Sequence, residues 1–187
     1  MSGEHIRFGL VAVKGVGRGF INAVLAERGR GGPFVSFPDF CQRMFDAELN
    51  KRVLENLIRC GAFDSMGIYR SRLLEAYEQL VDSIAQNKRK NLAGQFDLFG
   101  GDQTQSAPEL QVKNIPEFTR HELMTMEKET TGLYLTGHPM DEYRDVVKQC
   151  KAASMGAILS DFAQEGGPAI YHDEQRVTLA GVITASR

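Results

Sequence analysis

Most of the first 90 residues have apolar side chains every three or four positions, separated by short breaks rich in glycine and proline. This spacing is typical of amphipathic helices. It predicts helices over about residues 17–28, 36–45, 51–60 and 68–90. The breaks carry helix start and stop signals, because Ser36 and Asn50 are candidate N-caps and Gly61 is a candidate left-handed stop.

The pattern changes in the second half of the chain. Residues 91–115 have few apolar positions and predict a linker. Pro116 is expected to open a helix that runs to about Thr130 and ends at Gly132, and residues 140–150 predict a short helix after a turn. Residues 177–184 are β-branched and alternate imperfectly, which predicts a strand whose sheet partners would lie beyond this chain. The predicted fold class is therefore mainly α.

Composition indicates a globular domain, with 42% apolar and 25% charged residues. No run approaches the ~18 apolar residues of a membrane span, and residues 1–7 lack the apolar core of a signal peptide. The three cysteines, Cys41, Cys60 and Cys150, lack the spacing of a zinc site and are interpreted as reduced thiols of a cytoplasmic protein.

The net charge of −2 conceals an asymmetry. Residues 1–91 hold 14 Lys/Arg and 10 Asp/Glu, a net of +4, whereas residues 92–187 hold 8 and 14, a net of −6. A basic half could face nucleic acid. A split of this size is also common in ordinary domains, so charge alone leaves both interpretations open.

No catalytic or metal-binding constellation is present in the sequence. The four histidines are scattered without ligand spacing, and there is no phosphate loop or nucleophile elbow. His138, which precedes Pro139, is interpreted as a hydrogen-bonded residue of a turn. The sequence therefore predicts a binding function, with no catalytic residue, no metal and no cofactor.

A glycine-rich turn precedes the first predicted helix, in the order Val13-Lys14-Gly15-Val16-Gly17-Arg18-Gly19. Backbone N–H groups at a helix start can bind a phosphate, and glycines allow close approach of a sugar-phosphate backbone. Lys14 and Arg18 can neutralise neighbouring phosphates without reading base sequence, while Val16 can anchor the turn in the core. The candidate DNA-binding residues are Lys14, Gly15, Val16, Gly17, Arg18 and Gly19.

This turn resembles the hairpin of helix-hairpin-helix DNA-binding proteins. Residues 50–84 resemble a second, degenerate copy with its hairpin at residues 61–64, which lacks the second glycine and is expected to be mainly a packing partner. Residues 1–91 are therefore predicted to form a tandem helix-hairpin-helix domain. The alternative is a purely structural glycine-rich turn.

Inside the predicted linker, residues 92–115, lies the run Gln95-Phe96-Asp97-Leu98-Phe99. A segment that buries no apolar surface is normally polar. Two phenylalanines and a leucine therefore either fold back on the domain or bind a partner.

Three stretches of the chain resemble the alpha subunit of bacterial DNA polymerase III, the replicative polymerase. They are Ile6-Arg7-Phe8-Gly9-Leu10 leading into Lys14-Gly15-Val16-Gly17, then Asn50 to Glu55 through Gly61 to Asp64, and Gly132-Leu133-Tyr134-Leu135-Thr136-Gly137-His138-Pro139 through Tyr143. In that family, this region holds a tandem helix-hairpin-helix domain, a sliding-clamp-binding peptide and the start of an OB-fold domain.

The resemblance implies that residues 95–99 bind the sliding clamp, or beta subunit, that residues 116–150 form a helical segment, and that residues 151–187 begin a truncated OB fold. It implies double-stranded DNA, the clamp and other replicase subunits as partners, and no membrane. The metal-binding aspartates of the family's palm would lie upstream, so the fragment is expected not to polymerise DNA. The alternatives are a free-standing helix-hairpin-helix repair protein and a plain helical interaction domain.

Overall fold

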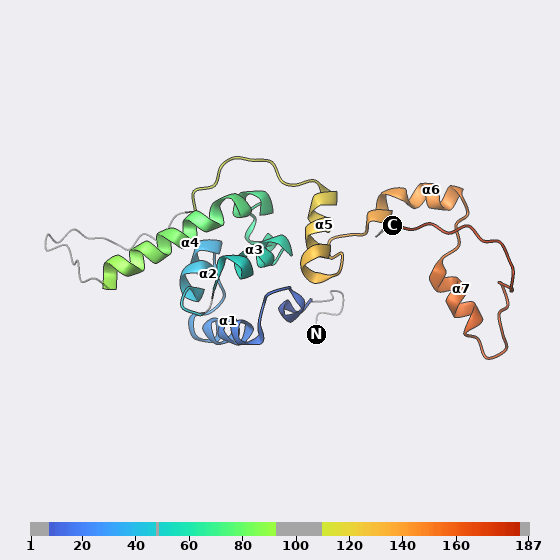
Figure 1. Ribbon diagram of the computed structural model, residues 1–187, viewed down its shortest axis with the longest axis horizontal. Coiled ribbons are helices and arrows are strands. Elements are labelled where there is room, and N and C mark those ends of the chain that lie inside the picture. The colour runs from blue at the N-terminus through green and yellow to red at the C-terminus, as the bar shows by residue number, and fades with distance from the viewer. Residues whose placement is uncertain (1–7, 48, 93–109, 184–187) are drawn as a thin grey trace. The chain divides into compact units, whose positions relative to one another are not determined.

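The computed structural model describes residues 8–47, 49–92 and 110–183, and it divides into a first unit that ends at Leu135 and a second unit that begins at Thr136 (Figure 1). The elements of the first unit are η1 (Leu10–Ala12), α1 (Arg18–Gly31), α2 (Phe37–Met44), α3 (Lys51–Arg59), η2 (Asp64–Met66), α4 (Arg70–Leu92) and α5 (Arg120–Thr131). Those of the second unit are η3 (Pro139–Tyr143), α6 (Arg144–Gln149) and α7 (Met155–Phe162). The described residues are thus helical, and the mainly α prediction is confirmed.

The core of the first unit lies between α1, α2, α3 and α4. Phe37, Leu54 and Leu73, one from each of the last three helices, are at most 1% exposed. The rings of Phe37 and Phe63 meet edge to face with centroids 5.0 Å apart, which favours the pair beyond its buried area. Residues from α1 and the turn before it complete the cluster: Val13, Val16, Phe20 and Val24.

The helix boundaries follow the local signals in the sequence. The Asp39 backbone N–H donates to the Ser36 side chain (3.2 Å), and the Val53 N–H donates to the Asn50 side chain (2.9 Å). Both side chains therefore satisfy an amide that the first helical turn leaves unpaired. At Gly132 the backbone enters the left-handed region (φ 79°) and ends α5, as the sequence predicts.

The start of α5 differs from the prediction. The helix begins at Arg120 rather than at Pro116, because Thr119 and Glu122 form a reciprocal capping box. Glu117 instead caps a different helix. Its carboxylate accepts the N–H groups of Arg70 (2.7 Å) and Ser71 (3.0 Å), the first two residues of α4.

Residues 110–117 lie along α4 in the opposite direction, which corrects the prediction that the linker extends to residue 115. Gln111 lines a hollow with residues 76–83, Lys113 pairs with Glu75, and Arg72 donates to the Ile115 carbonyl (3.0 Å). Further along, Ser71 donates to the Pro116 carbonyl (2.8 Å). These contacts fasten the segment to the helix, while residues 93–109 lie outside the described part of the chain.

The second unit is thinly packed. Among its described residues, 136–183, no apolar side chain is buried and Asp161 is the one buried residue. The predicted helix over residues 140–150 appears as η3 followed by α6, and α7 was not predicted. His138 caps η3, because its Nδ1 accepts the Met140 N–H (3.1 Å), which confirms the structural role expected for it.

The predicted strand over residues 177–184 is absent from its described part, residues 177–183. Val177, Leu179 and Ile183 are 41–85% exposed there, so no neighbouring strand or apolar layer covers them. β-branched composition favours a strand only where a partner pairs with its backbone.

None of the described helices is long and apolar enough to cross a bilayer.

Candidate nucleic-acid interface

The glycine-rich turn lies between η1 and α1, at the edge of the first unit's core. Gly15 has φ 77°, a conformation that favours glycine, and the Val16 N–H closes the turn on the Val13 carbonyl (3.1 Å). Val13 and Val16 are 2% and 6% exposed. These two side chains hold the turn in the core, so Val16 anchors the turn as the sequence predicts.

The same anchoring leaves the remaining residues of the turn at the surface. Lys14, Gly15, Gly17, Arg18 and Gly19 are all exposed. A Cβ on Gly17 or Gly19 would meet nothing within 4 Å, so their outer side is open. The structure therefore brings the sequence-predicted residues together on one turn, with the glycine backbone accessible to a ligand.

Electrostatics at this turn favour an anion. No side chain caps the start of α1, and its first turn holds no acidic residue. The positive end of the helix dipole is therefore combined with Arg18 in the first turn and Lys14 just before it. Within the described part of the chain, neither cation takes part in an ion pair. Positive charges gathered at a helix start repel one another, and a phosphate bound there would offset this repulsion.

Two distant elements hold the Lys14 backbone on both sides. The Lys14 N–H donates to the Thr130 carbonyl at the end of α5 (2.9 Å). Its carbonyl accepts from the side-chain amide of Asn56 on α3 (2.7 Å). Sequence reasoning missed both residues, because a single hydrogen bond over 42 residues or more leaves no periodic signal.

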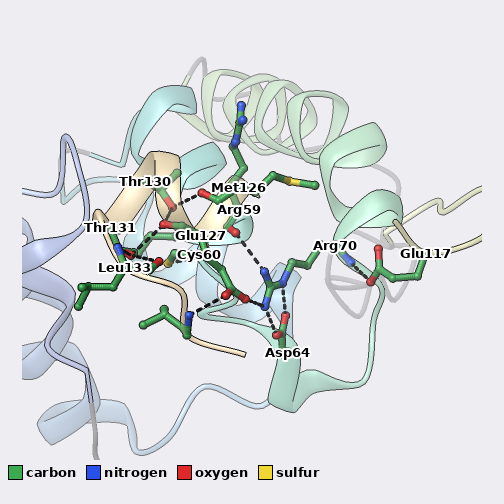
Figure 2. A network of polar contacts seen from close by, with 12 residues as sticks. Arg59, Cys60, Asp64, Arg70, Glu117, Met126, Glu127, Thr130, Thr131 and Leu133 are labelled. Atoms are coloured by element: carbon green, nitrogen blue, oxygen red, sulfur yellow. Dashed lines mark hydrogen bonds and ion pairs between the residues drawn. The ribbon is translucent and has the colours of Figure 1, made fainter. Parts of the chain in front are cut away.

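The turn between α3 and α4, residues 60–69, where the sequence predicts a second hairpin, is closed by Arg70 rather than open (Figure 2). Gly61 has φ 80°, as its predicted role requires. The Arg70 guanidinium donates to Asp64 (2.6 and 2.9 Å) and to the Arg59 carbonyl (3.1 Å). The side chain of Arg70 is 3% exposed, so this hairpin is filled by an internal ion pair. The prediction that residues 50–84 form a second, degenerate copy of the motif stays a prediction.

The Arg70 network extends to α5. Glu127, 0% exposed, accepts from Arg70 (3.0 Å) with one oxygen and from the Leu135 N–H (2.8 Å) with the other (Figure 2). Burial alone would lower the pKa of Arg70, but hydrogen bonds and charge from Asp64 and Glu127 outweigh it and raise the pKa. The network thus holds α5, and with it the Thr130 carbonyl, against the start of α4 and the turn before it.

The other predicted sites are not assembled by the described residues. Gln95, Phe96, Asp97, Leu98 and Phe99 lie outside them. Among the described residues, no group of three or more His, Cys, Asp or Glu could hold a metal ion.

Comparison with known proteins identifies the family. The family described as "Helix-hairpin-helix motif" matches residues 1–73. The chain is 34% identical over 191 residues to a "DNA polymerase III subunit alpha" of Xylella fastidiosa, 98% of this chain and 16% of that protein. It is 35% identical over 184 residues to the Vibrio cholerae protein of that name, 97% of this chain and 15% of that protein.

The protein of the same name from Thermus aquaticus is 38% identical over 185 residues, 97% of this chain and 14% of that protein. The chain belongs to the DNA polymerase III alpha subunit family. It spans about one sixth or less of the length of these curated relatives. The helix-hairpin-helix match falls on α1 to the start of α4 of this alpha-subunit segment.

Proposed function

We propose that this alpha-subunit segment binds duplex DNA through the turn from Lys14 to Gly19, without reading base sequence. The observation that carries the proposal is the exposed glycine turn at the uncapped start of α1, flanked by Lys14 and Arg18. Backbone amides and two cations are ligands for phosphate oxygens, which position DNA without specifying its sequence. Apart from Lys14 and Arg18, the turn presents no exposed side chain, because its other residues are glycines and the buried Val16.

Salt-dependent binding of a fluorescent duplex tests this proposal. Lys14→Gln with Arg18→Gln should weaken binding and make the slope of log affinity against log salt shallower by about two, because each contacted phosphate releases about 0.9 counterions. Arg52→Gln with Arg89→Gln is the matched control. Both residues are exposed and the change in net charge is the same. An equal effect of the two pairs would show a general charge effect and overturn the assignment.

We also propose that Gln95, Asp97, Leu98 and Phe99 form the sliding-clamp-binding peptide, with Phe96 at a more tolerant position. The support is the sequence pattern and its place in the family. Two apolar anchors contribute on the order of 2 kcal/mol each, and ordering the peptide offsets part of this. The expected affinity is therefore weak, and a clamp that encircles the same DNA raises it through effective concentration.

Capture on an immobilised sliding clamp tests the peptide. Leu98→Ala with Phe99→Ala should abolish retention, whereas Phe96→Ala should retain most of it. Circular dichroism should show the same helical content for all variants. Retention of the double variant would refute the clamp assignment.

In this proposal the segment serves a DNA-directed DNA polymerase of chromosomal replication in the cytoplasm and is itself non-catalytic. In this proposal residues 151–187 belong to an OB fold. Incorporation of nucleotides by the 187-residue chain would contradict the non-catalytic role.

The alternatives are a free-standing helix-hairpin-helix repair protein and an interaction-only helical domain. A repair protein would bind DNA but not the clamp, and an interaction domain would show no change in salt slope.

A further inference from the structure

A hollow of about 640 Å³ lies in the second unit, where the chain leaves α6 and the later segment 175–178 passes beside it. This volume falls in the range of small-molecule pockets, which are roughly 300–1,000 Å³. Its walls come from residues 147–148 and 150–154 on one side and from Tyr171 and residues 175–178 on the other. The whole hollow lies within one unit, and it is remote in sequence from the glycine turn.

Three cations line this hollow, namely Lys148, Lys151 and Arg176, and no Asp or Glu is among the lining residues. All three are exposed, and within the described part of the chain none of them takes part in an ion pair. The second half of the chain has a net charge of −6. The three cations therefore give the hollow a positive potential that attracts anions, although the second half of the chain is acidic overall.

Lys151 occupies a backbone position that normally belongs to glycine. The end of α6 forms a Schellman motif, in which the Ala152 N–H donates to the Val147 carbonyl (3.1 Å) and the Lys151 N–H donates to the Lys148 carbonyl (3.0 Å). Lys151 sits at the left-handed position of that motif with φ 49°. A non-glycine residue there costs conformational energy, so the strain points to a use for this side chain.

The two walls of the hollow are fastened to each other and to α7. The Ala153 N–H donates to the Thr178 carbonyl (2.8 Å), which holds the segment of Arg176 against the end of α6. The Tyr171 N–H donates to Asp161 on α7 (2.8 Å). These bonds bring cations from separate segments, residues 148–151 and 176, to a single space.

We propose that this hollow binds phosphate groups, with Lys148, Lys151 and Arg176 as the ligands. Charge-assisted hydrogen bonds from ammonium and guanidinium groups suit phosphate oxygens. Tyr171 adds an aromatic wall against which a sugar or base can pack. The chemistry is shared by a free polyphosphate or nucleotide and by the backbone of a nucleic-acid strand.

Amide NMR shifts of the ¹⁵N-labelled 187-residue chain test this site during titration with inorganic pyrophosphate and, separately, with a short single-stranded oligonucleotide. Both titrations use chain carrying Lys14→Gln and Arg18→Gln, so that the glycine turn contributes little. We expect saturable shifts at residues 148–154 and 175–178. A failure here leaves the duplex-binding test of the glycine turn unaffected, so the two proposals fail separately.

Lys151→Gly is the decisive variant, because folding and binding should respond in opposite directions. Glycine relieves the left-handed strain, so the thermal midpoint should stay the same or rise, while phosphate affinity falls about tenfold with the lost charge. Arg176→Gln should show a similar loss of affinity. Arg144→Gln is the control, since it removes one positive charge from the same unit at a residue paired with Asp141 outside the hollow.

Two outcomes overturn the proposal: no saturable shifts with either ligand, or equal weakening by Arg144→Gln and the two lining variants. Saturation by pyrophosphate at an affinity close to that for the strand supports a site for free phosphate ligands. Saturation by the oligonucleotide alone supports a phosphate-backbone site.

Discussion

The side-chain amide of Asn56 donates a hydrogen bond of 2.7 Å to the carbonyl of Lys14, across 42 residues of sequence. The same peptide segment is held from the other side by the Thr130 carbonyl, which accepts the Lys14 N–H (2.9 Å). The exposed Lys14 side chain is therefore attached to a backbone that is hydrogen-bonded to α3 on one side and to α5 on the other. The candidate DNA-binding turn is built by the whole first unit rather than by a local motif alone.

Asn56→Ala should loosen this turn while leaving the core intact. The lost hydrogen bond is expected to cost about 0.5–1.5 kcal/mol and to speed hydrogen exchange of the Lys14 and Val16 amides relative to amides of α3. Gln42→Ala, an exposed amide side chain on α2, is the control. Unchanged exchange at Lys14 would mean that Asn56 does not hold the turn.

Gly61→Ala should destabilise the first unit more than Gly67→Ala. Both glycines are left-handed, with φ 80° and 73°, and that conformation costs an alanine roughly 1–3 kcal/mol. A Cβ on Gly61 would also come within 2.7 Å of the Arg70 Cζ, whereas one on Gly67 meets nothing within 4 Å. The difference between the two variants in urea unfolding measures the cost of the clash with Arg70 alone. Equal free energies of unfolding would show that Arg70 can move aside.

Arg70→Leu should lower the free energy of unfolding by about 3–5 kcal/mol, because Glu127 would remain buried without its cation. The same replacement at Arg30 is the comparison. The Arg30 side chain is 80% exposed and its pairing with Glu27 is an exposed contact of the kind worth about 0–1 kcal/mol. Similar losses at both positions would contradict the role assigned to the buried network.

Acid should release the loop that follows α7. The backbone N–H groups of Tyr171, Ile170 and Ala169 donate to Asp161 and hold the pKa of its carboxyl below the ordinary value, with the Tyr171 N–H making the largest contribution. Because the native pKa lies below the unfolded one, this stabilisation is complete above the unfolded value and is lost as pH falls through the native value.

The amide shifts of residues 169–171 report this step in a pH titration at the acidic end of the range. In Asp161→Asn the acid-dependent step should vanish, since a neutral amide accepts fewer of these bonds at any pH. An identical titration in both proteins would place the step on another group.

Local signals account for what the sequence predicted well. The caps at Ser36 and Asn50, the left-handed glycines at 61 and 132, and the glycine turn before α1 depend on neighbours within a few residues, which a single sequence displays. The anchoring of Val16 follows from the same short-range logic.

Tertiary contacts account for what the sequence did not predict. Pro116 looked like a helix start, but Glu117 caps α4 across 47 residues and the α5 boundary moves to Thr119. The β-branched composition of residues 177–184 predicts a strand, but residues 177–183, the part that the structure describes, form none. No local pattern in the sequence singles out Arg70 or Glu127, and only folding brings them together in the interior.

The antiparallel course of residues 110–117 along α4 has a consequence for the segment that carries the candidate clamp peptide. Glu117 holds the first amides of α4, and Arg72 holds the Ile115 carbonyl, so residues 110–135 are joined to the preceding domain by contacts independent of the peptide link through 93–109. A protease cut within 93–109 should therefore give two fragments that elute together under native conditions and separate only in denaturant. A cut on one side of the candidate clamp peptide would therefore leave the first unit folded.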